Sequence, residues 1–336
     1  MVRIKLGILF VAGMIANLQA QDRPLLTLTR TISLPAVSGR FDHMAFDPVS
    51  HRLFVAATGN HSVEVIDVEQ GKVLERITGL GKPHGLAWIP DEGKLFVADG
   101  TLAALRVYSG SPLELTASLP LSDDADDVVY DEATKLLYVG HGGSDSANPA
   151  RIAVVSTVNN SLIENEATSS HPEALEIDRT GKRIFANIAD SAEVVVLDAS
   201  SHRNTSTWKL ATAKDNVPLA YDAEDQLLVL GCRVPATAVL LDAATGKELG
   251  SRPSSAGADD LFFEPSTRRV YLISSSGTVD VYKIGSDRSI TTLGAVKTRA
   301  GAKTALLVPS LKTLFVALPA GGNQPAAIQM YTTAAK

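Results

Sequence analysis

The chain has 336 residues, a formal net charge of −6 and a hydrophobic fraction of 45%. This composition is typical of a globular protein, and the acidic balance argues against nucleic-acid binding, which needs clustered Lys and Arg. The single cysteine, Cys232, excludes an intramolecular disulfide, so packing must supply the stability.

The first predicted element is a signal peptide over residues 1–20. Two basic residues precede an apolar run from Leu6 to Ile15, and small Ala20 stands at the expected cleavage site. The run is too short to cross a bilayer, and no later stretch reaches the ~20 apolar residues of a membrane helix. We therefore expect a periplasmic or secreted monomer without a membrane span, in which residues 21–336 form one domain.

A repeated unit dominates the rest of the chain. It consists of an apolar-x-aromatic segment, a turn, a basic residue and a second apolar run, and it occurs seven times. Successive copies are 42 to 47 residues apart, and their equivalent positions are Asp47, Ile89, Asp131, Asp178, Asp222, Glu264 and Val308. Periods of this size are typical of four-stranded propeller blades. The sequence therefore predicts an all-β fold, a seven-bladed β-propeller of four-stranded antiparallel blades.

Each unit holds four strand-like runs separated by turn residues. In the first unit the runs cover residues 43–47, 52–57, 62–67 and 72–78. No segment keeps a 3.6-residue apolar period, so we expect little helix. We call the equivalent position of each unit, such as Asp47 in the first, its anchor. Apolar side chains stand one and three places before each anchor, which puts them on one strand face. A closed ring of blades would bury that face.

The two ends of the chain are predicted to close the ring together. The seventh unit ends with a third strand near Tyr331 and lacks a fourth. The segment Leu25 to Leu34 supplies a strand-like run at the other end of the chain. We expect this N-terminal strand to complete the last blade and to leave no unpaired seam.

Short segments within the repeats, such as LFVA from Leu53 and VEVID from Val63, resemble the YVTN-repeat β-propeller family. The resemblance covers about Leu25 to Tyr331. The segments GCRVPA, GADDLFFEP and GAKTALLVP are similar to a subgroup of exported bacterial propellers without an established activity. The resemblance implies a propeller fold, and related propellers serve as binding scaffolds, as lactonases and as haem or quinone enzyme subunits.

Ionisable residues collect on one face of the predicted ring. Loops that enter the innermost strand and loops that leave the second strand share this face. Five of the seven histidines fall there, at His43, His61, His84, His141 and His171. The candidate ligand or metal residues are Asp42, His43, His84, Asp126, Asp127, His141, His171, Glu173, Cys232, Arg233, Asp259, Asp260 and Lys303.

Several interpretations of this ring stay open. Imidazole and carboxylate groups that converge on an axis can bind a divalent metal ion, and crowded carboxylates also suit a cationic or polyhydroxylated ligand. Alternatively, the polar residues simply face a hydrated channel or cap backbone N–H groups. Cys232 is either a nucleophile activated by a neighbour or a small packing residue.

The predicted function is an exported binding or scaffold module that engages a small ligand or a protein partner at the channel mouth. The alternative is a metal-dependent hydrolase that resembles the gluconolactonase-type propellers and uses an axial Asp/Glu/His site. Those enzymes add Asn ligands, and the only nearby amide here is Asn216. A role as a redox subunit has no support, because the sequence contains no motif for covalent cofactor attachment.

Overall fold

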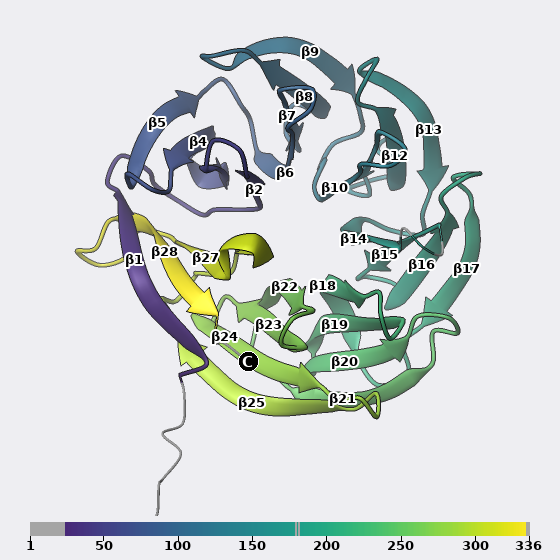
Figure 1. Cartoon of the computed structure of the whole chain (residues 1–336). Helices are drawn as coiled ribbons and strands as arrows, with labels where there is room; N and C mark the ends of the chain where they lie inside the picture. Colours follow the sequence, from purple (N-terminus) through teal and green to yellow (C-terminus); the bar gives the residue numbers. More distant parts are fainter. Residues whose placement is uncertain (1–23, 179, 181, 334–336) are drawn as a thin grey trace, which may run out of the picture.

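Seven four-stranded sheets form a ring around a central channel in the computed structural model, which describes residues 24–178, 180 and 182–333 (Figure 1). The predicted signal peptide, residues 1–20, lies outside the described residues. Every pair of neighbouring strands within a sheet is antiparallel. The predicted fold class, a seven-bladed β-propeller, is therefore confirmed.

The blades follow one another in chain order, each from its inner to its outer strand. Blade 1 consists of β2 (Met44–Asp47), β3 (Arg52–Ala57), β4 (Ser62–Asp67) and β5 (Lys72–Ile77). Blade 2 consists of β6 (Pro83–Ile89), β7 (Lys94–Asp99), β8 (Ala104–Ser109) and β9 (Glu114–Pro120). Blade 3 consists of β10 (Val128–Asp131), β11 (Leu136–His141), β12 (Arg151–Ser156) and β13 (Ser161–Ala167). Blade 4 consists of β14 (Pro172–Asp178), β15 (Arg183–Ile188), β16 (Glu193–Asp198) and β17 (Asn204–Lys209).

The remaining blades keep the same order until the last. Blade 5 consists of β18 (Lys214–Asp222), β19 (Leu227–Val234), β20 (Ala236–Asp242) and β21 (Glu248–Pro253). Blade 6 consists of β22 (Ala258–Glu264), β23 (Arg269–Ser274), β24 (Thr278–Ile284) and β25 (Ile290–Lys297). Blade 7 consists of β26 (Ala305–Val308), β27 (Thr313–Leu318), β28 (Ala326–Thr333) and the N-terminal β1 (Leu26–Leu34).

Helix is scarce, as predicted. Within the described ranges the helices are two 3₁₀ turns, η1 (Thr58–Asn60) and η2 (Pro309–Leu311). No helix there is long and apolar enough to cross a membrane.

The turn between the first two strands of a blade explains the acidic anchor of the repeat. The carboxylate of Asp47 accepts hydrogen bonds from the backbone N–H groups of Val49 at 3.0 Å and Ser50 at 3.3 Å. Arg52 then pairs with Asp47 at 2.9 Å. Such a side-chain turn replaces backbone hydrogen bonds that the chain loses where it reverses. Asp178 and Arg183 repeat the ion pair at 2.6 Å.

Aromatic side chains one place before the anchors of blades 1, 2 and 5 pack against the preceding blade. Trp88 of blade 2 stacks on Phe54 of blade 1, with ring centroids 5.1 Å apart. Tyr221 of blade 5 packs on Phe185 of blade 4 at 5.4 Å. These contacts bury apolar area that one blade alone would leave in water, so the ring is stabilised blade by blade.

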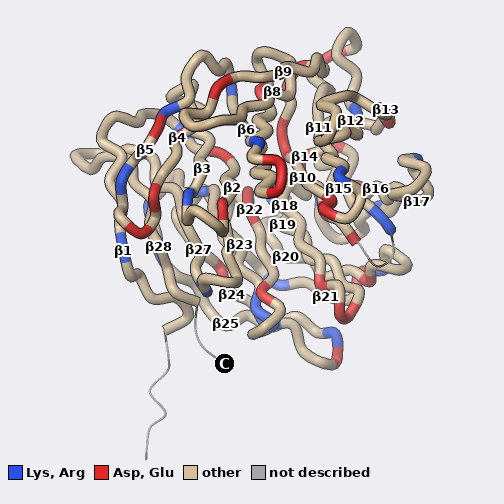
Figure 2. The backbone as a smooth tube through the Cα atoms, turned by 45° about the horizontal axis from the view of Figure 1, so that its top comes forward, with Lys and Arg blue, Asp and Glu red and all other residues tan. Residues whose placement is uncertain are grey.

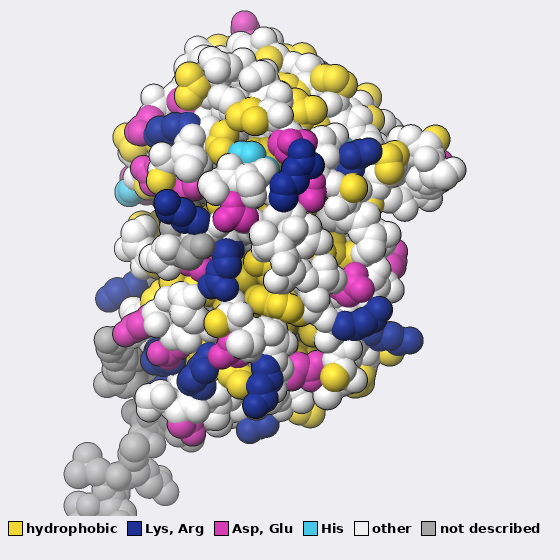
Figure 3. Space-filling view, turned by 90° about the vertical axis from the view of Figure 1, so that its right-hand side faces the viewer, with side chains coloured by type: hydrophobic (Ala, Val, Ile, Leu, Met, Phe, Trp, Pro, Cys, Tyr) yellow, Lys and Arg dark blue, Asp and Glu magenta, His cyan; other side chains and the backbone are white. Residues whose placement is uncertain are grey.

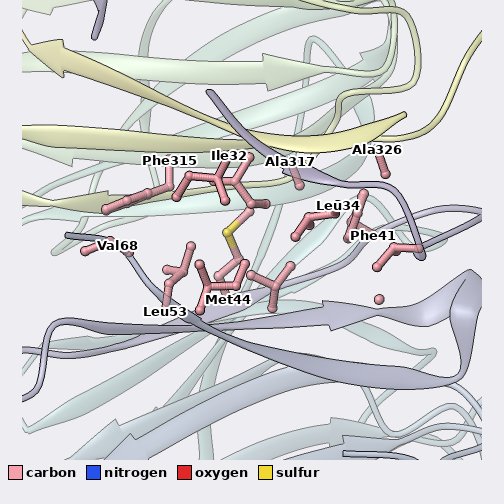
Figure 4. Close-up of a cluster of buried hydrophobic side chains, with 14 of the residues drawn as sticks. Ile32, Leu34, Phe41, Met44, Leu53, Val68, Phe315, Ala317 and Ala326 are labelled. Carbon is pink, nitrogen blue, oxygen red and sulfur yellow. The ribbon is translucent and has the colours of Figure 1, made fainter. Parts of the chain in front are cut away.

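The N-terminal strand closes the ring, as predicted. Strand β1 pairs antiparallel with β28, and Figure 1 shows these two ends of the chain side by side. Ile32 and Leu34 of β1 are almost completely buried, and Figure 4 shows them between Phe315 and the residues of blade 1. Arg30 adds a polar link, because its guanidinium donates to three consecutive backbone carbonyl groups, those of residues 68–70, in blade 1.

All seven outer strands contain a β-bulge. Each pairing of an outer strand with its inner neighbour shows a register shift. A bulge twists an edge strand and makes it a poor template for another chain. Charged side chains lie among apolar ones over the side of the ring in Figure 3. Both features oppose edge-to-edge association of the blades of different molecules.

Candidate functional site

A cavity of about 220 Å³ opens at one end of the channel. We call it the mouth cavity. Its lining residues are Arg40, Asp42, His43, Lys82, His84, Asp124, Asp126, His171, Glu173, Val217, Arg233, Asp259 and Lys303. Twelve of these thirteen are ionisable, so the cavity suits a polar occupant. Figure 2 shows acidic and basic segments meeting beside β6 and β10, at the centre of the ring.

Bulges at the start of four inner strands direct side chains into this cavity. The ladder between β14 and β15 skips Glu173, and the ladder between β22 and β23 skips Asp259. Register shifts also leave out His84 in β6 and Val217 in β18. A residue outside the ladder no longer follows the alternation of its strand, and bulges are used in this way to re-aim side chains at functional sites.

His84 lies between carboxylates of both neighbouring blades. Its Nδ1 atom is 3.0 Å from Asp42 and 2.9 Å from Asp126, and its side chain is only 4% exposed. Burial alone would lower the pKa of His84, but the carboxylates of Asp126 and Asp42 outweigh it and raise the pKa to about 9. Burial would raise the pKa of Asp126, but His84 and His171 hold it well below the usual range. The three groups therefore form a buried, charged chain.

His43 forms the floor of the mouth cavity. Its Nε2 atom lies 3.7 Å from Asp42, and its Nδ1 atom lies 3.5 Å from Asp260. Burial lowers the pKa of His43, but the carboxylate of Asp260 raises it well above the ordinary value. His43 also lines a second, deeper cavity of about 190 Å³, as does Asp259. The two side chains therefore stand where the mouth passes into the channel.

Glu173 and His171 form the wall contributed by blade 4. Nδ1 of His171 donates to the carbonyl oxygen of Gly142 at 2.7 Å, and its Nε2 lies 3.6 Å from Asp126. Burial lowers the pKa of His171, but Asp126 raises it to about 9. Burial and the charge of Asp126 raise the pKa of Glu173 to about 7. Glu173 forms no hydrogen bond or ion pair with any residue that the structure describes.

Two basic side chains share one carboxylate on the opposite wall. Arg233 donates to Asp259 at 2.7 Å, and Nζ of Lys303 lies 2.5 Å from the other oxygen of Asp259. Burial raises the pKa of Asp259, and the ammonium group of Lys303 partly offsets this. Within the cavity lining this wall therefore holds two basic side chains and one carboxylate, while a second carboxylate, that of Asp215, lies 3.9 Å from Arg233 outside the lining.

Nine of the thirteen candidate residues lie in the mouth cavity, and four do not. Asp127 and Asp260 point to the deeper cavity and accept backbone N–H groups, Asp127 from Leu175 and Asp260 from Ala305, both at 2.7 Å. Burial raises the pKa of Asp127. These two carboxylates join neighbouring blades below the mouth.

His141 and Cys232 lie in the protein interior instead of at the mouth. His141 accepts a hydrogen bond from the N–H of Ser122 at 3.0 Å and contacts Asn165 at 2.9 Å, and burial lowers its pKa. Cys232 packs in the apolar core, and burial raises its pKa to about 12. Their column in the repeat ends the second strand and is buried throughout, at Ala57, Asp99, His141, Ile188, Cys232, Ser274 and Leu318. The alternation of the strand therefore turns this column away from the channel.

Three ionisable residues of the mouth cavity are absent from the prediction, namely Arg40, Lys82 and Asp124. Each stands two places before a predicted residue, in the column of the repeat that also holds His171. Arg40 pairs with Asp42 at 3.2 Å, and Lys82 pairs with Asp124 at 2.7 Å. Reading that whole column would have found all three.

The fold and the site together define a seven-bladed β-propeller with an ionisable cavity at its channel mouth. No family model matches the sequence, and no curated protein matches it. A solved structure of hydrazine synthase from Kuenenia stuttgartiensis is similar, with a TM-score of 0.73 and 17% identity over 83% of this chain and 92% of that chain. A chain of the mitotic checkpoint complex has a TM-score of 0.75 and 14% identity, over 98% of this chain and 99% of that chain. At these identities the similarity establishes the propeller fold alone.

Proposed function

We propose that this propeller is a binding module that holds a small, oxygen-rich anionic ligand in the mouth cavity. The observation that carries the proposal is the lining, in which ionisable side chains surround almost the whole cavity. A volume of about 220 Å³ is smaller than the ~300–1,000 Å³ of sites for drug-sized ligands. The ligand is therefore a small molecule, and a protein partner would contact only the rim.

The distribution of charge at the wall formed by Arg233 and Lys303 favours an anionic ligand. The carboxylates of Asp42 and Asp126 are already paired with the imidazole of His84. Among the described residues Lys303 shares its carboxylate partner, Asp259, with Arg233, so its ammonium group can donate to a ligand as well. A carboxylate or a polarised hydroxyl group can accept hydrogen bonds from such side chains.

Burial supports a functional role over a merely hydrated channel. The side chains of Asp42 and His84 are 7% and 4% exposed, so they have lost most of their hydration. Withdrawing charges from water costs free energy even when they are paired. Clusters of desolvated, interacting ionisable groups in a cavity are typical of functional sites.

A thermal-shift screen tests this proposal. Small hydroxycarboxylates and sugar acids should raise the melting temperature, whereas matched polyols and amines should have little effect. Lys303→Met should weaken binding of the best acid at least tenfold. Lys135→Met is the matched control, because Lys135 pairs with Asp91 outside the mouth cavity. Preferential binding of amines, or unchanged binding by Lys303→Met, would contradict the proposal.

A hydrolase acting at the same site is the second candidate. Its support is Glu173, whose pKa of about 7 suits a general acid or base at neutral pH. The amide of Asn216 donates to the carbonyl oxygen of Glu193 at 2.9 Å and does not line the mouth cavity, which weakens the parallel with gluconolactonase-type propellers. Hydrolysis of lactones or esters that Glu173→Gln abolishes would favour this candidate, and no turnover of either class would argue against it.

We further propose that the protein is exported as a monomer and is related to the YVTN-repeat propellers. The support is the basic, then apolar N-terminal sequence and the repeated LFVA segments. The similar chain from the mitotic checkpoint complex is compatible with a scaffold role as well. The intact mass and the size-exclusion elution of the exported protein test export and oligomeric state together.

A further inference from the structure

Three metal-binding side chains converge on one wall of the mouth cavity. One oxygen of Asp126, one nitrogen of His171 and one oxygen of Glu173 all lie within 4.8 Å of one another. Ligand atoms at roughly 2.0–2.4 Å from a divalent ion lie roughly 3–4 Å apart, so small side-chain movements would bring these three atoms onto one ion. The three residues come from two neighbouring blades, so the fold must form before they meet.

His171 is oriented as a metal ligand would be. Its Nδ1 donates to the carbonyl oxygen of Gly142, so Nε2 is the nitrogen left for a metal ion, which would displace the Nε2 proton on binding. Nε2 is buried and has no hydrogen-bond partner among the described residues. Metal-binding histidines typically have their other ring N–H fixed in this way.

The loop that supplies the carbonyl group is held close to His171 by glycines. Gly142 has a φ of +74°, and a Cβ atom there would come within 2.3 Å of the carbonyl oxygen of Pro149. A Cβ atom on Gly143 would meet the backbone nitrogen of His171 at 3.0 Å. The loop is therefore shaped to approach this imidazole.

The two carboxylates are also presented to the same point. Oδ1 of Asp126 is held by His84 at 2.9 Å, which leaves Oδ2 on the side of His171. The bulge in β14 projects Glu173 out of its strand. Among the described residues nothing pairs with the Glu173 carboxylate, so it is available to a ligand.

A second group of potential metal ligands, formed by Asp42, His43 and Asp126, is less suitable. Asp42 already contacts Arg40 at 3.2 Å and His84 at 3.0 Å. His43 lies near a third carboxylate, that of Asp260.

We infer that Asp126, His171 and Glu173 bind one divalent cation of the kind that accepts mixed nitrogen and oxygen ligands, such as Zn²⁺ or Mn²⁺. Three protein ligands leave a coordination position open toward the cavity. The inference rests on the proposed function for the remaining ligand, an oxygen of the bound anion, whose other end would meet Lys303.

Calorimetric titration of the full chain with ZnCl₂ or MnCl₂, after treatment with chelator and dialysis, tests this inference. The protein should bind about one equivalent, and Glu173→Gln and His171→Gln should each weaken binding at least tenfold. Asp124→Asn is the control, because Asp124 lines the same cavity, pairs with Lys82 and belongs to neither group of potential metal ligands among the described residues. Circular dichroism shows whether each variant is folded.

Each outcome decides the matter. One equivalent, lost in both ligand variants and retained in Asp124→Asn, supports the site. No binding, or equal affinity in Glu173→Gln and the wild-type protein, overturns it, as does an equal loss in Asp124→Asn. Binding of the acid ligand is also measured in the presence of chelator, which separates the two claims. If the acid still binds but no metal does, the metal site is refuted and the proposed function stands.

Discussion

Nδ1 of His84 lies 2.9 Å from Oδ1 of Asp126, a residue of the neighbouring blade. The contact is buried, and it links β6 of blade 2 to the loop that enters β10 of blade 3. The charged imidazole therefore contributes to the stability of the ring as well as to the chemistry of the mouth cavity.

Stability should fall as the pH rises through the range in which His84 loses its proton. The pKa of His84 is about 9 in the folded protein against 6.5 ordinarily, so its contribution is complete below about pH 6.5 and is lost as the pH approaches 9. Urea unfolding at several pH values between 6 and 9 measures this slope. His84→Gln should flatten it, while His51→Gln, in a turn outside the mouth cavity, should keep the wild-type slope. Equal slopes in all three proteins would refute the charged contact.

Replacing Glu173 by Gln should stabilise the metal-free protein, prepared with chelator, at alkaline pH. The pKa of Glu173 is raised from 4.5 to about 7, so the unfolded chain ionises first and stability falls as the pH rises through this window. Glu173→Gln removes that cost, which amounts to about 3 kcal/mol because one pKa unit corresponds to ~1.4 kcal/mol. The unfolding free energies of both proteins should differ at pH 8 and nearly agree at pH 4.5. A less stable variant at pH 8 would show that the carboxylate has a partner.

The repeat made the fold predictable, because its period, its turn residues and its apolar columns all require the same ring. Closure by β1 was predictable for the same reason, since the seventh unit lacks one strand. For the site, the sequence predicts which equivalent positions of the repeat lie near the channel mouth, but not which individual side chains line the cavity. Glu173 and Asp259 line the mouth cavity, as their place at the start of the inner strands predicts. Cys232 and His141 are expected there as well but do not line it, because their strand end faces the core. Individual distances depend on bulges, which the sequence pattern does not reveal.

Ile32→Ala should weaken the closure of the ring. Ile32 is 2% exposed and packs between the last blade and the first, and truncation of a buried Ile typically costs ~2–5 kcal/mol. Thr31→Ala is the control on the adjacent, exposed position of β1. Deleting residues 21–35 should cause aggregation or a large fall in melting temperature. An unchanged melting temperature after that deletion would disprove closure by the N-terminal strand.

Cys232 should be unreactive in the folded protein. Its side chain is buried in the core, and burial raises its pKa to about 12, so little thiolate forms at neutral pH. A chromogenic disulfide reagent should label it at least a hundredfold more slowly in buffer than in denaturant. Rapid labelling of the folded protein would instead place this thiol at an accessible site.

The most direct test of the central claim is a crystal structure of the protein soaked with the strongest acid from the thermal-shift screen. The account predicts electron density for the ligand in the mouth cavity, with an acidic group within hydrogen-bond distance of Lys303 or Arg233 on the wall that contains Asp259. Density for the ligand only at another surface, with the mouth cavity filled by water, would contradict it.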